Sequence, residues 1–289
     1  MSVEEAYAEV GRITRREAKN FAYGIMVLPK AKRQAIAAIY AFARSVDDIA
    51  DGELPLEQKR VRLEELRAAL DSDPADPVFV ALRDARERFA IPRDPLAALV
   101  DGGLQDLEQA TYADFDDLRG YCEKVAGAVG LACVPVYGSD DTDRAMTLGI
   151  ALQLINIIRD VDEDRRLGRV YLPQDEIAAF EVTGVGWTEP PSSGGVGFAG
   201  AGAIQELAPS PEFRELMAFQ AERARTYLAE GLRLLDSLDR RSALCVGTFA
   251  GLYRETLDRI EASGFDVFGE KTRLSTPRKL AVVARGLFP

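Results

Sequence analysis

Apolar residues recur along most of this chain at intervals of three and four, the spacing that places them on one face of a helix. Strand-like alternation between turn signals is scarce. The pattern predicts helices at about 3–23, 29–52, 57–70, 77–90, 94–110, 114–137, 141–164, 211–238 and 241–263. We therefore expect an all-α fold.

One segment interrupts this pattern: residues 182–211 are crowded with Gly, Pro and Ser. Such a composition cannot bury enough apolar surface to offset the entropy lost on ordering. Helical patterning of similar composition resumes on both sides of the segment. We therefore expect a mobile loop inside a single domain that covers residues 1–289, rather than a linker between two domains.

Two acidic clusters each end an otherwise apolar, helix-like stretch. Residues 35–46 precede the first cluster, residues 47–51, and residues 148–159 precede the second, residues 160–164. The C-terminus of a helix carries partial negative charge, so acids there are disfavoured. We expect cationic groups beside both clusters.

The second of these helices carries a polar stripe. Gln153, Asn156, Asp160 and Asp164 are spaced by three, four and four residues, which places them on one face, and the other faces are apolar. A helix that is apolar nearly all round is buried, so its stripe should line a cavity or meet polar partners. The alternative is an ordinary surface stripe that ends in acids.

The first helix repeats this design, with Tyr40, Arg44, Asp47 or Asp48, and Asp51 about one turn apart. The alternative here is a solvated C-terminal turn. If the two helices face one another, several carboxylates converge, and burying that charge unpaired is costly. Mg²⁺ prefers hard oxygen ligands and uses one or two carboxylates together with substrate phosphates. The pattern therefore predicts a magnesium site and a diphosphate substrate.

Arginines near the acids could hold the phosphate oxygens through forked hydrogen bonds. They are Arg44, Arg159, Arg165, Arg166 and Arg169. Simple charge balance at the helix ends is the alternative for these side chains.

Composition removes several classes of function. A net charge of −11 argues against a nucleic-acid-binding surface, and the absence of histidine removes His-based triads and the commonest zinc ligand. Three cysteines, Cys122, Cys133 and Cys245, form no metal motif, which fits core thiols in a reducing cytosol. Neither a signal peptide nor a membrane span is evident. We expect a cytoplasmic protein, at most peripheral to the inner face of the membrane.

Four ordered motifs resemble those of the squalene/phytoene synthase family. They occupy residues 40–51, 121–130, 153–164 and 168–173. The likeness extends from about residue 10 to residue 285. Two further segments look most like the bacterial presqualene diphosphate synthases of hopanoid biosynthesis, namely residues 15–25 and 264–279.

The resemblance implies a single-domain isoprenoid synthase fold, a helical bundle around a central cavity. It also implies Mg²⁺-dependent head-to-head (1′-1) condensation of two farnesyl diphosphates to presqualene diphosphate. That product feeds squalene and hopanoid synthesis, so downstream isoprenoid enzymes are among the expected partners. Mn²⁺ is the alternative metal. The competing interpretations are phytoene synthase, which uses two geranylgeranyl diphosphates, full squalene synthase, and a non-catalytic helical metal-binding scaffold. Squalene synthase needs NADPH, for which no Gly-rich fingerprint is evident.

Family roles transfer to matching positions of this chain. The metal-binding positions are Asp47, Asp48, Asp51, Asn156, Asp160 and Asp164. The substrate-binding positions are Phe21, Tyr40, Arg44, Gln153, Asn156, Arg159 and Lys271. Tyr121, Tyr171 and Tyr253 match tyrosines that line the reaction centre and, with Asp47, Asp51, Asp160 and Asp164, complete the expected catalytic set. Ala18 departs from the family pattern, because several relatives carry a diphosphate-binding Ser there.

Overall fold

The long helices predicted from apolar periodicity are present in the computed structural model, which describes residues 1–17, 24–72, 74–183, 209–268, 274–275, 277–279 and 281–282. The helices of the first half are α1 (Val3–Glu17), α3 (Lys30–Asp51), α4 (Leu56–Ala69), α5 (Pro77–Phe89), α6 (Arg93–Glu108), α7 (Phe115–Cys122), the π-helix η1 (Glu123–Gly127) and α8 (Ala128–Tyr137). Those of the second half are α9 (Thr142–Arg166), α10 (Gln174–Ala179), α11 (Pro211–Leu232), the 3₁₀-helix η2 (Arg233–Ser237) and α12 (Arg240–Ala262). No strand forms among these described residues.

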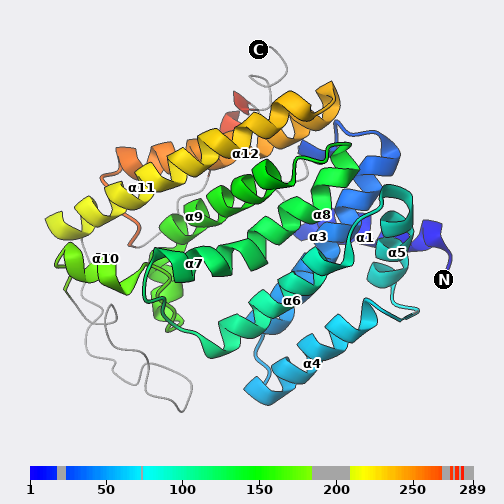
Figure 1. Ribbon diagram of the computed structural model, residues 1–289, viewed down its shortest axis with the longest axis horizontal. Helices are drawn as coiled ribbons and strands as arrows, with labels where there is room; N and C mark the ends of the chain where they lie inside the picture. Colours follow the sequence, from blue (N-terminus) through cyan, green and yellow to red (C-terminus); the bar gives the residue numbers. More distant parts are fainter. Residues whose placement is uncertain are drawn as a thin grey trace.

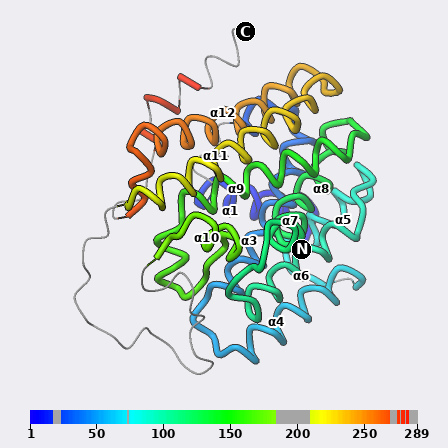
Figure 2. The backbone as a smooth tube through the Cα atoms, turned by 60° about the vertical axis from the view of Figure 1, so that its left-hand side comes forward, coloured from blue at the N-terminus to red at the C-terminus, as the bar shows by residue number. Residues whose placement is uncertain are grey.

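Helix α9 runs through the middle of the bundle (Figure 1). It packs against α11 and α12 on one side and against η1 and α8 on the other. Helices α3 and α6 pack against α8. Helices α1 and α5 pack against α3, and α4 lies at the outer edge beside α6 (Figure 2). The helices that carry the two acidic clusters, α3 and α9, thus belong to neighbouring layers of one bundle.

Side-chain caps explain where several helices begin. The Asp76 carboxylate accepts a hydrogen bond from the Val78 backbone N–H at 2.8 Å, with Pro77 at the first helical position of α5. Ser210 Oγ accepts one from the Phe213 N–H at 3.1 Å at the start of α11, in the same arrangement. These caps satisfy N–H groups that have no partner within the helix.

Glycines let α9 approach its neighbours closely. A Cβ at Gly149 would lie 2.4 Å from the Ala126 carbonyl oxygen, and one at Gly130 would lie 2.3 Å from that of Ala145. These two contacts run in opposite directions along the chain, so α8 and α9 form an antiparallel pair. The small residues of 127–130 therefore serve close helix contact, and some of them also border the cavity described below.

Two features were not predicted. The helix expected at 114–137 contains a π turn at η1, where an extra residue is accommodated beside α9. The short helix α10 was missed because six residues are too few to display a helical period. The predicted loop falls mostly on residues 184–208, which lie outside the described residues.

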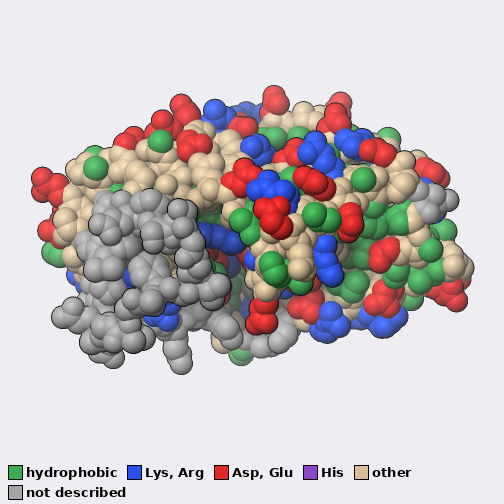
Figure 3. Space-filling view, turned by 90° about the horizontal axis from the view of Figure 1, so that it is seen from below, with side chains coloured by type: hydrophobic (Ala, Val, Ile, Leu, Met, Phe, Trp, Pro, Cys, Tyr) green, Lys and Arg blue, Asp and Glu red, His purple; other side chains and the backbone are tan. Residues whose placement is uncertain are grey.

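The three cysteines are buried free thiols, as predicted. Acidic and basic side chains are interspersed over the visible part of the face shown in Figure 3, without a continuous basic patch there. In the described part of the chain, no helix is both long and apolar enough to cross a bilayer.

Candidate active site

A cavity of about 680 Å³ lies between α3, α6, α8, α9 and α12. Its polar end is bordered by the acids of α3 and α9 together with arginines and tyrosines. The rest of its wall is apolar and includes Ile36, Ile39, Leu148, Val246 and Phe249. Such a shape suits a ligand with a charged head and a hydrocarbon tail.

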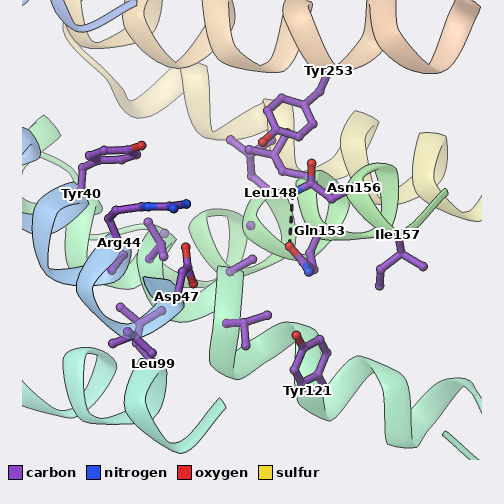
Figure 4. Close-up of a pocket in the computed structure, with 18 of the residues that line it drawn as sticks. Tyr40, Arg44, Asp47, Leu99, Tyr121, Leu148, Gln153, Asn156, Ile157 and Tyr253 are labelled. Carbon is purple, nitrogen blue, oxygen red and sulfur yellow. Dashed lines mark hydrogen bonds between the residues drawn. The ribbon is translucent and has the colours of Figure 1, made fainter. Parts of the chain in front are cut away.

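The first acidic cluster meets the cavity through one face of α3. Tyr40, Arg44, Asp47 and Asp51 all line it, and Figure 4 shows Arg44 extending across it toward α9. Asp48 does not line the cavity, because the next position on a helix points about 100° away. Its carboxylate instead lies 2.5 Å from Arg44 Nη2 and is largely exposed.

The second cluster meets the cavity through the predicted polar stripe of α9. Gln153, Asn156, Asp160 and Asp164 all line it, so the stripe faces inward rather than toward solvent. The Asn156 amide donates a hydrogen bond to Gln153 Oε1 at 3.3 Å, and Tyr253 of α12 lies above this pair (Figure 4). The surface-stripe alternative is therefore wrong.

Cations lie beside both clusters, as predicted. Arg159 Nε donates to Asp160 Oδ1 at 2.9 Å, and Arg159 Nη2 lies 2.5 Å from Asp160 Oδ2. Arg169 Nη1 donates to Asp51 Oδ1 at 2.9 Å and so joins the end of α3 to the segment after α9. Arg165 and Arg166, in contrast, both pair with the buried Asp162, at 3.0 and 2.6 Å. Charge balance, rather than contact with the cavity, explains those two.

The electrostatics of the polar end favour an added positive charge. Burial, together with the nearby charge of Asp51, raises the pKa of Asp47 to about 7. Arg44 opposes this shift only partly. A cation placed between these carboxylates would stabilise the ionised form of Asp47.

A tyrosine cluster with a buried acid forms the adjoining wall. Tyr121 and Tyr171 donate hydrogen bonds from their hydroxyls to the two oxygens of Asp106 at 2.8 and 2.9 Å. Their rings stack with centroids 5.2 Å apart, and Tyr112 packs on both. Burial, together with the charges of this cluster, raises the pKa of both Tyr121 and Tyr171. Both phenols are therefore neutral and directed at one carboxylate.

Asp106 was missed by the sequence analysis. It lies in α6, 15 residues before Tyr121 and 65 before Tyr171, and no local acidic pattern marks it. The feature that could have indicated Asp106 is a lone acid on an otherwise apolar face of α6. That face also holds Leu99 and Gly103, and all three residues line the cavity.

The residues at the polar end fit a divalent cation that is shared with a substrate. Asn156 Oδ1 is buried, lines the cavity and has no hydrogen-bond partner, so an oxygen ligand is available. No three acids among the described residues are close enough to hold a metal by themselves. Mg²⁺ typically binds one or two carboxylates together with water and phosphate oxygens, so a site shared with a diphosphate needs few protein ligands.

Two predicted substrate-binding residues, Phe21 and Lys271, lie outside the described residues. Tyr40, Arg44, Gln153, Arg159, Tyr121, Tyr171 and Tyr253 all line the cavity. The same holds for each predicted metal-binding residue except Asp48.

Comparison with known proteins agrees with this geometry. The profile of the squalene/phytoene synthase family matches residues 14–279. The chain is 41% identical to the phytoene synthase of Mycobacterium tuberculosis over 290 residues, covering 99% of this chain and 91% of that protein.

Solved structures show the same fold. The crystal structure of a dehydrosqualene synthase in complex with ligand superimposes with a TM-score of 0.86 at 26% identity, covering 99% of this chain and 96% of that one. The squalene synthase HpnC from Alicyclobacillus acidocaldarius superimposes with a TM-score of 0.75 at 25% identity, covering 91% and 95%.

Proposed function

Because this chain belongs to the squalene/phytoene synthase family, we propose that it joins two prenyl diphosphates head to head (1′-1), with two geranylgeranyl diphosphates as substrates and phytoene as product. The observation that carries the reaction type is the cavity itself, which combines acids and arginines at one end with an apolar interior. The choice of the twenty-carbon substrate is supported by the phytoene synthase at 41% identity.

This choice departs from the sequence motifs, which favoured farnesyl diphosphate and presqualene diphosphate. The motifs at residues 40–51 and 153–164 border the polar end, where a diphosphate would bind, and that head group is common to both substrates. Presqualene diphosphate synthesis is the second candidate, supported by the structural likeness to HpnC. A non-catalytic scaffold would not need a buried polar stripe beside an apolar cavity.

In the proposed reaction, Asp47, Asp51, Asp160, Asp164 and Asn156 hold Mg²⁺ at the polar end. Mn²⁺ is the alternative ion. When bound with the substrate, the ion supplies positive charge that stabilises the departing diphosphate. Asp48 lies outside the cavity and fixes the Arg44 side chain through its ion pair.

Arginines of the polar end bind the diphosphate oxygens. Arg44 is suited to this role because its buried Nε has no hydrogen-bond partner and can donate to a phosphate oxygen. Arg159 and Arg169 reach the same end of the cavity from α9 and from the segment after it, and Gln153 adds an amide donor. These contacts orient C1 of each substrate toward the apolar interior.

Aromatic rings stabilise the cation that forms there. The C1–O bond breaks with its electron pair leaving on the diphosphate, and the double bond of the second substrate attacks the allylic cation. One proton is lost as a cyclopropylcarbinyl diphosphate forms. This intermediate loses its own diphosphate with the C–O electron pair, rearranges and loses a second proton to give phytoene, so that each turnover releases two diphosphates and two protons. Tyr40, Tyr121, Tyr171, Phe249 and Tyr253 line this region, and their ring faces attract cationic carbon.

Product identification tests the proposal. The purified protein is incubated with Mg²⁺ and either geranylgeranyl or farnesyl diphosphate, with and without NADPH. We expect phytoene from geranylgeranyl diphosphate, independent of NADPH. Presqualene diphosphate from farnesyl diphosphate, at higher kcat/KM, would replace the proposal with the second candidate. Squalene formed only with NADPH would indicate full squalene synthase, and no turnover of either substrate would favour the scaffold.

A further inference from the structure

Tyr112, in the segment between α6 and α7, packs against the two tyrosines that border the cavity. Its side chain is fully buried and does not line the cavity itself. Its ring stacks on that of Tyr171, with centroids 5.7 Å apart and an angle of 22° between the planes. It also contacts the ring of Tyr121, with centroids 5.3 Å apart and an angle of 46°. Tyr112 therefore supports both rings without facing the substrate.

The main chain of Tyr112 holds the segment that carries Tyr171. The Tyr112 carbonyl oxygen accepts a hydrogen bond from the Gln174 N–H at 2.9 Å, and the Ala110 carbonyl oxygen accepts one from the Val170 N–H at 2.7 Å. These bonds involve only backbone atoms, so they remain available when the side chain at residue 112 is replaced. A change of that side chain thus isolates what the ring contributes.

The Tyr112 hydroxyl is buried and has no hydrogen-bond partner among the described residues. Burial, together with the nearby charge of Asp106, raises the pKa of this phenol, so the phenol is neutral. A hydroxyl that bonds to no neighbouring side chain does not orient that side chain. The contribution of Tyr112 therefore comes from its ring, and Tyr112→Phe, which keeps the ring, is the matched control for Tyr112→Leu.

The orientation of the Tyr121 and Tyr171 rings matters for the cation that forms in the cavity. A phenol attracts a cation through the face of its ring rather than through the edge. A hydrogen bond from its hydroxyl to a carboxylate polarises the phenol and makes that face more negative. Tyr121 and Tyr171 donate such bonds to Asp106 at 2.8 and 2.9 Å, and both line the cavity. Rotation of either ring would lose the hydrogen bond, the exposed face or both.

We propose that Tyr112 is a positioning residue for the condensation, because its ring fixes the planes of Tyr121 and Tyr171 against Asp106; this inference rests on the proposed function. Aromatic pairs favour particular angles and spacings, so two contacts from one ring restrict both phenols at once. A Leu side chain fills much of the same space but imposes no ring geometry. In Tyr112→Leu, the two phenols should adopt orientations in which a hydroxyl leaves Asp106.

Steady-state kinetics with Mg²⁺ and geranylgeranyl diphosphate test the inference. We expect Tyr112→Leu to lower kcat at least about tenfold, because misoriented phenols stabilise the cationic transition state less. KM, and the calorimetric Kd of an unreactive thiodiphosphate analogue of the substrate, should change by less than about threefold, since Tyr112 does not line the cavity. Tyr112→Phe should keep kcat within about twofold of the wild type. Wild-type kcat in folded Tyr112→Leu, a loss confined to KM, or an equal loss in Tyr112→Phe would overturn the inference.

Combination with Asp106→Asn separates positioning of the phenols from a general loss of structure. If both residues act through the same two phenols, their effects on kcat should not multiply, and the double variant should lie within about threefold of the slower single variant. Effects that multiply would show that Tyr112 acts independently of Asp106, which would overturn the inference.

Crystal structures of the variants test the inference without turnover. In Tyr112→Leu at least one phenol should lose its hydrogen bond to Asp106, whereas Tyr112→Phe should keep both; two intact bonds in Tyr112→Leu would overturn the inference. If Tyr112→Leu does not fold, Tyr112→Met, which fills the space with a flexible chain, decides in the same way. Wild-type protein that converts only farnesyl diphosphate, or neither substrate, would contradict the proposed function, while these hydrogen bonds would still accept or refute the role of Tyr112.

Discussion

Replacement of Asp106 by Asn should slow the reaction without weakening substrate binding. The Asp106 carboxylate accepts hydrogen bonds from Tyr121 and Tyr171. An Asn side chain has one oxygen that can accept and an amide nitrogen that only donates, so one phenol loses its acceptor and the cluster loses its negative charge. A hydrogen bond to a charged group contributes about 1.5–3 kcal/mol.

The size of the effect follows from this loss. If it falls wholly on the cationic transition state, about 1.4 kcal/mol per tenfold predicts a kcat lower by about 10- to 150-fold. The hydrogen bonds of Asp106 go to the two tyrosines, and Arg169 is affected only through the charge of Asp106, so KM for geranylgeranyl diphosphate should change by less than about threefold. Steady-state product formation with Mg²⁺ measures both quantities.

A matched control lies on the same helix. Asp101→Asn makes the same chemical change, but the Asp101 carboxylate forms an exposed ion pair with Arg67 at 2.5 Å. Such pairs contribute at most about 1 kcal/mol, so this variant should keep wild-type kcat and KM. Wild-type kcat in folded Asp106→Asn, or a loss confined to KM, would refute the reasoning.

Three further predictions concern catalysis, packing and pH. Asp160→Asn should abolish turnover while the circular dichroism spectrum stays helical; wild-type activity would remove Asp160 from the metal site. Gly149→Ala should lower the free energy of unfolding by about 1–3 kcal/mol, because the new Cβ meets the Ala126 carbonyl oxygen. Thermal melting at neutral pH measures this loss. An unchanged Tm would show that α9 can shift to make room for the methyl group. The Lys32 ammonium and the cap hydrogen bonds lower the pKa of Asp239, so the contribution of this carboxylate to stability is present above about pH 4 and is lost as the pH falls toward the lowered pKa. In urea unfolding, Asp239→Asn should therefore lower the free energy of unfolding more at pH 7 than at pH 3. Equal losses at both pH values would contradict the assignment.

The sequence was most informative where local period and burial coincide. The polar stripe from Gln153 to Asp164 could be assigned to a cavity because the rest of α9 is too apolar for a surface helix. That α3 and α9 both border one cavity could be expected from their shared acidic ends. Asp48 could not be separated from Asp47, because which of two adjacent acids faces inward depends on the exact rotation of α3.

Other parts depend on contacts between distant segments. Asp106 becomes a partner of Tyr121 and Tyr171 only once α6 packs against η1, which follows Tyr121, and the segment after α9 folds beside them. The expectation of a fifteen-carbon substrate rested on residues 15–25 and 264–279, whereas the motifs at 40–51 and 153–164 border the polar end of the cavity, where the two candidate substrates carry the same diphosphate. The hydrogen bond of Lys32 to the Tyr137 carbonyl and its ion pair with Asp239 likewise join distant segments, and no short motif contains them.

The close contacts of α9 determine which walls of the cavity can move. Gly149 and Gly130 bring α9 and the helices before it together at backbone distance, and a Cβ at Gly231 of α11 would lie 2.6 Å from Leu148 Cα on the opposite side. Helices in such contact cannot separate without exposing main chain along their length. Helix α9 is therefore a wall of the cavity whose backbone is held on two sides, and a shift of α9 is a costly way to widen the cavity.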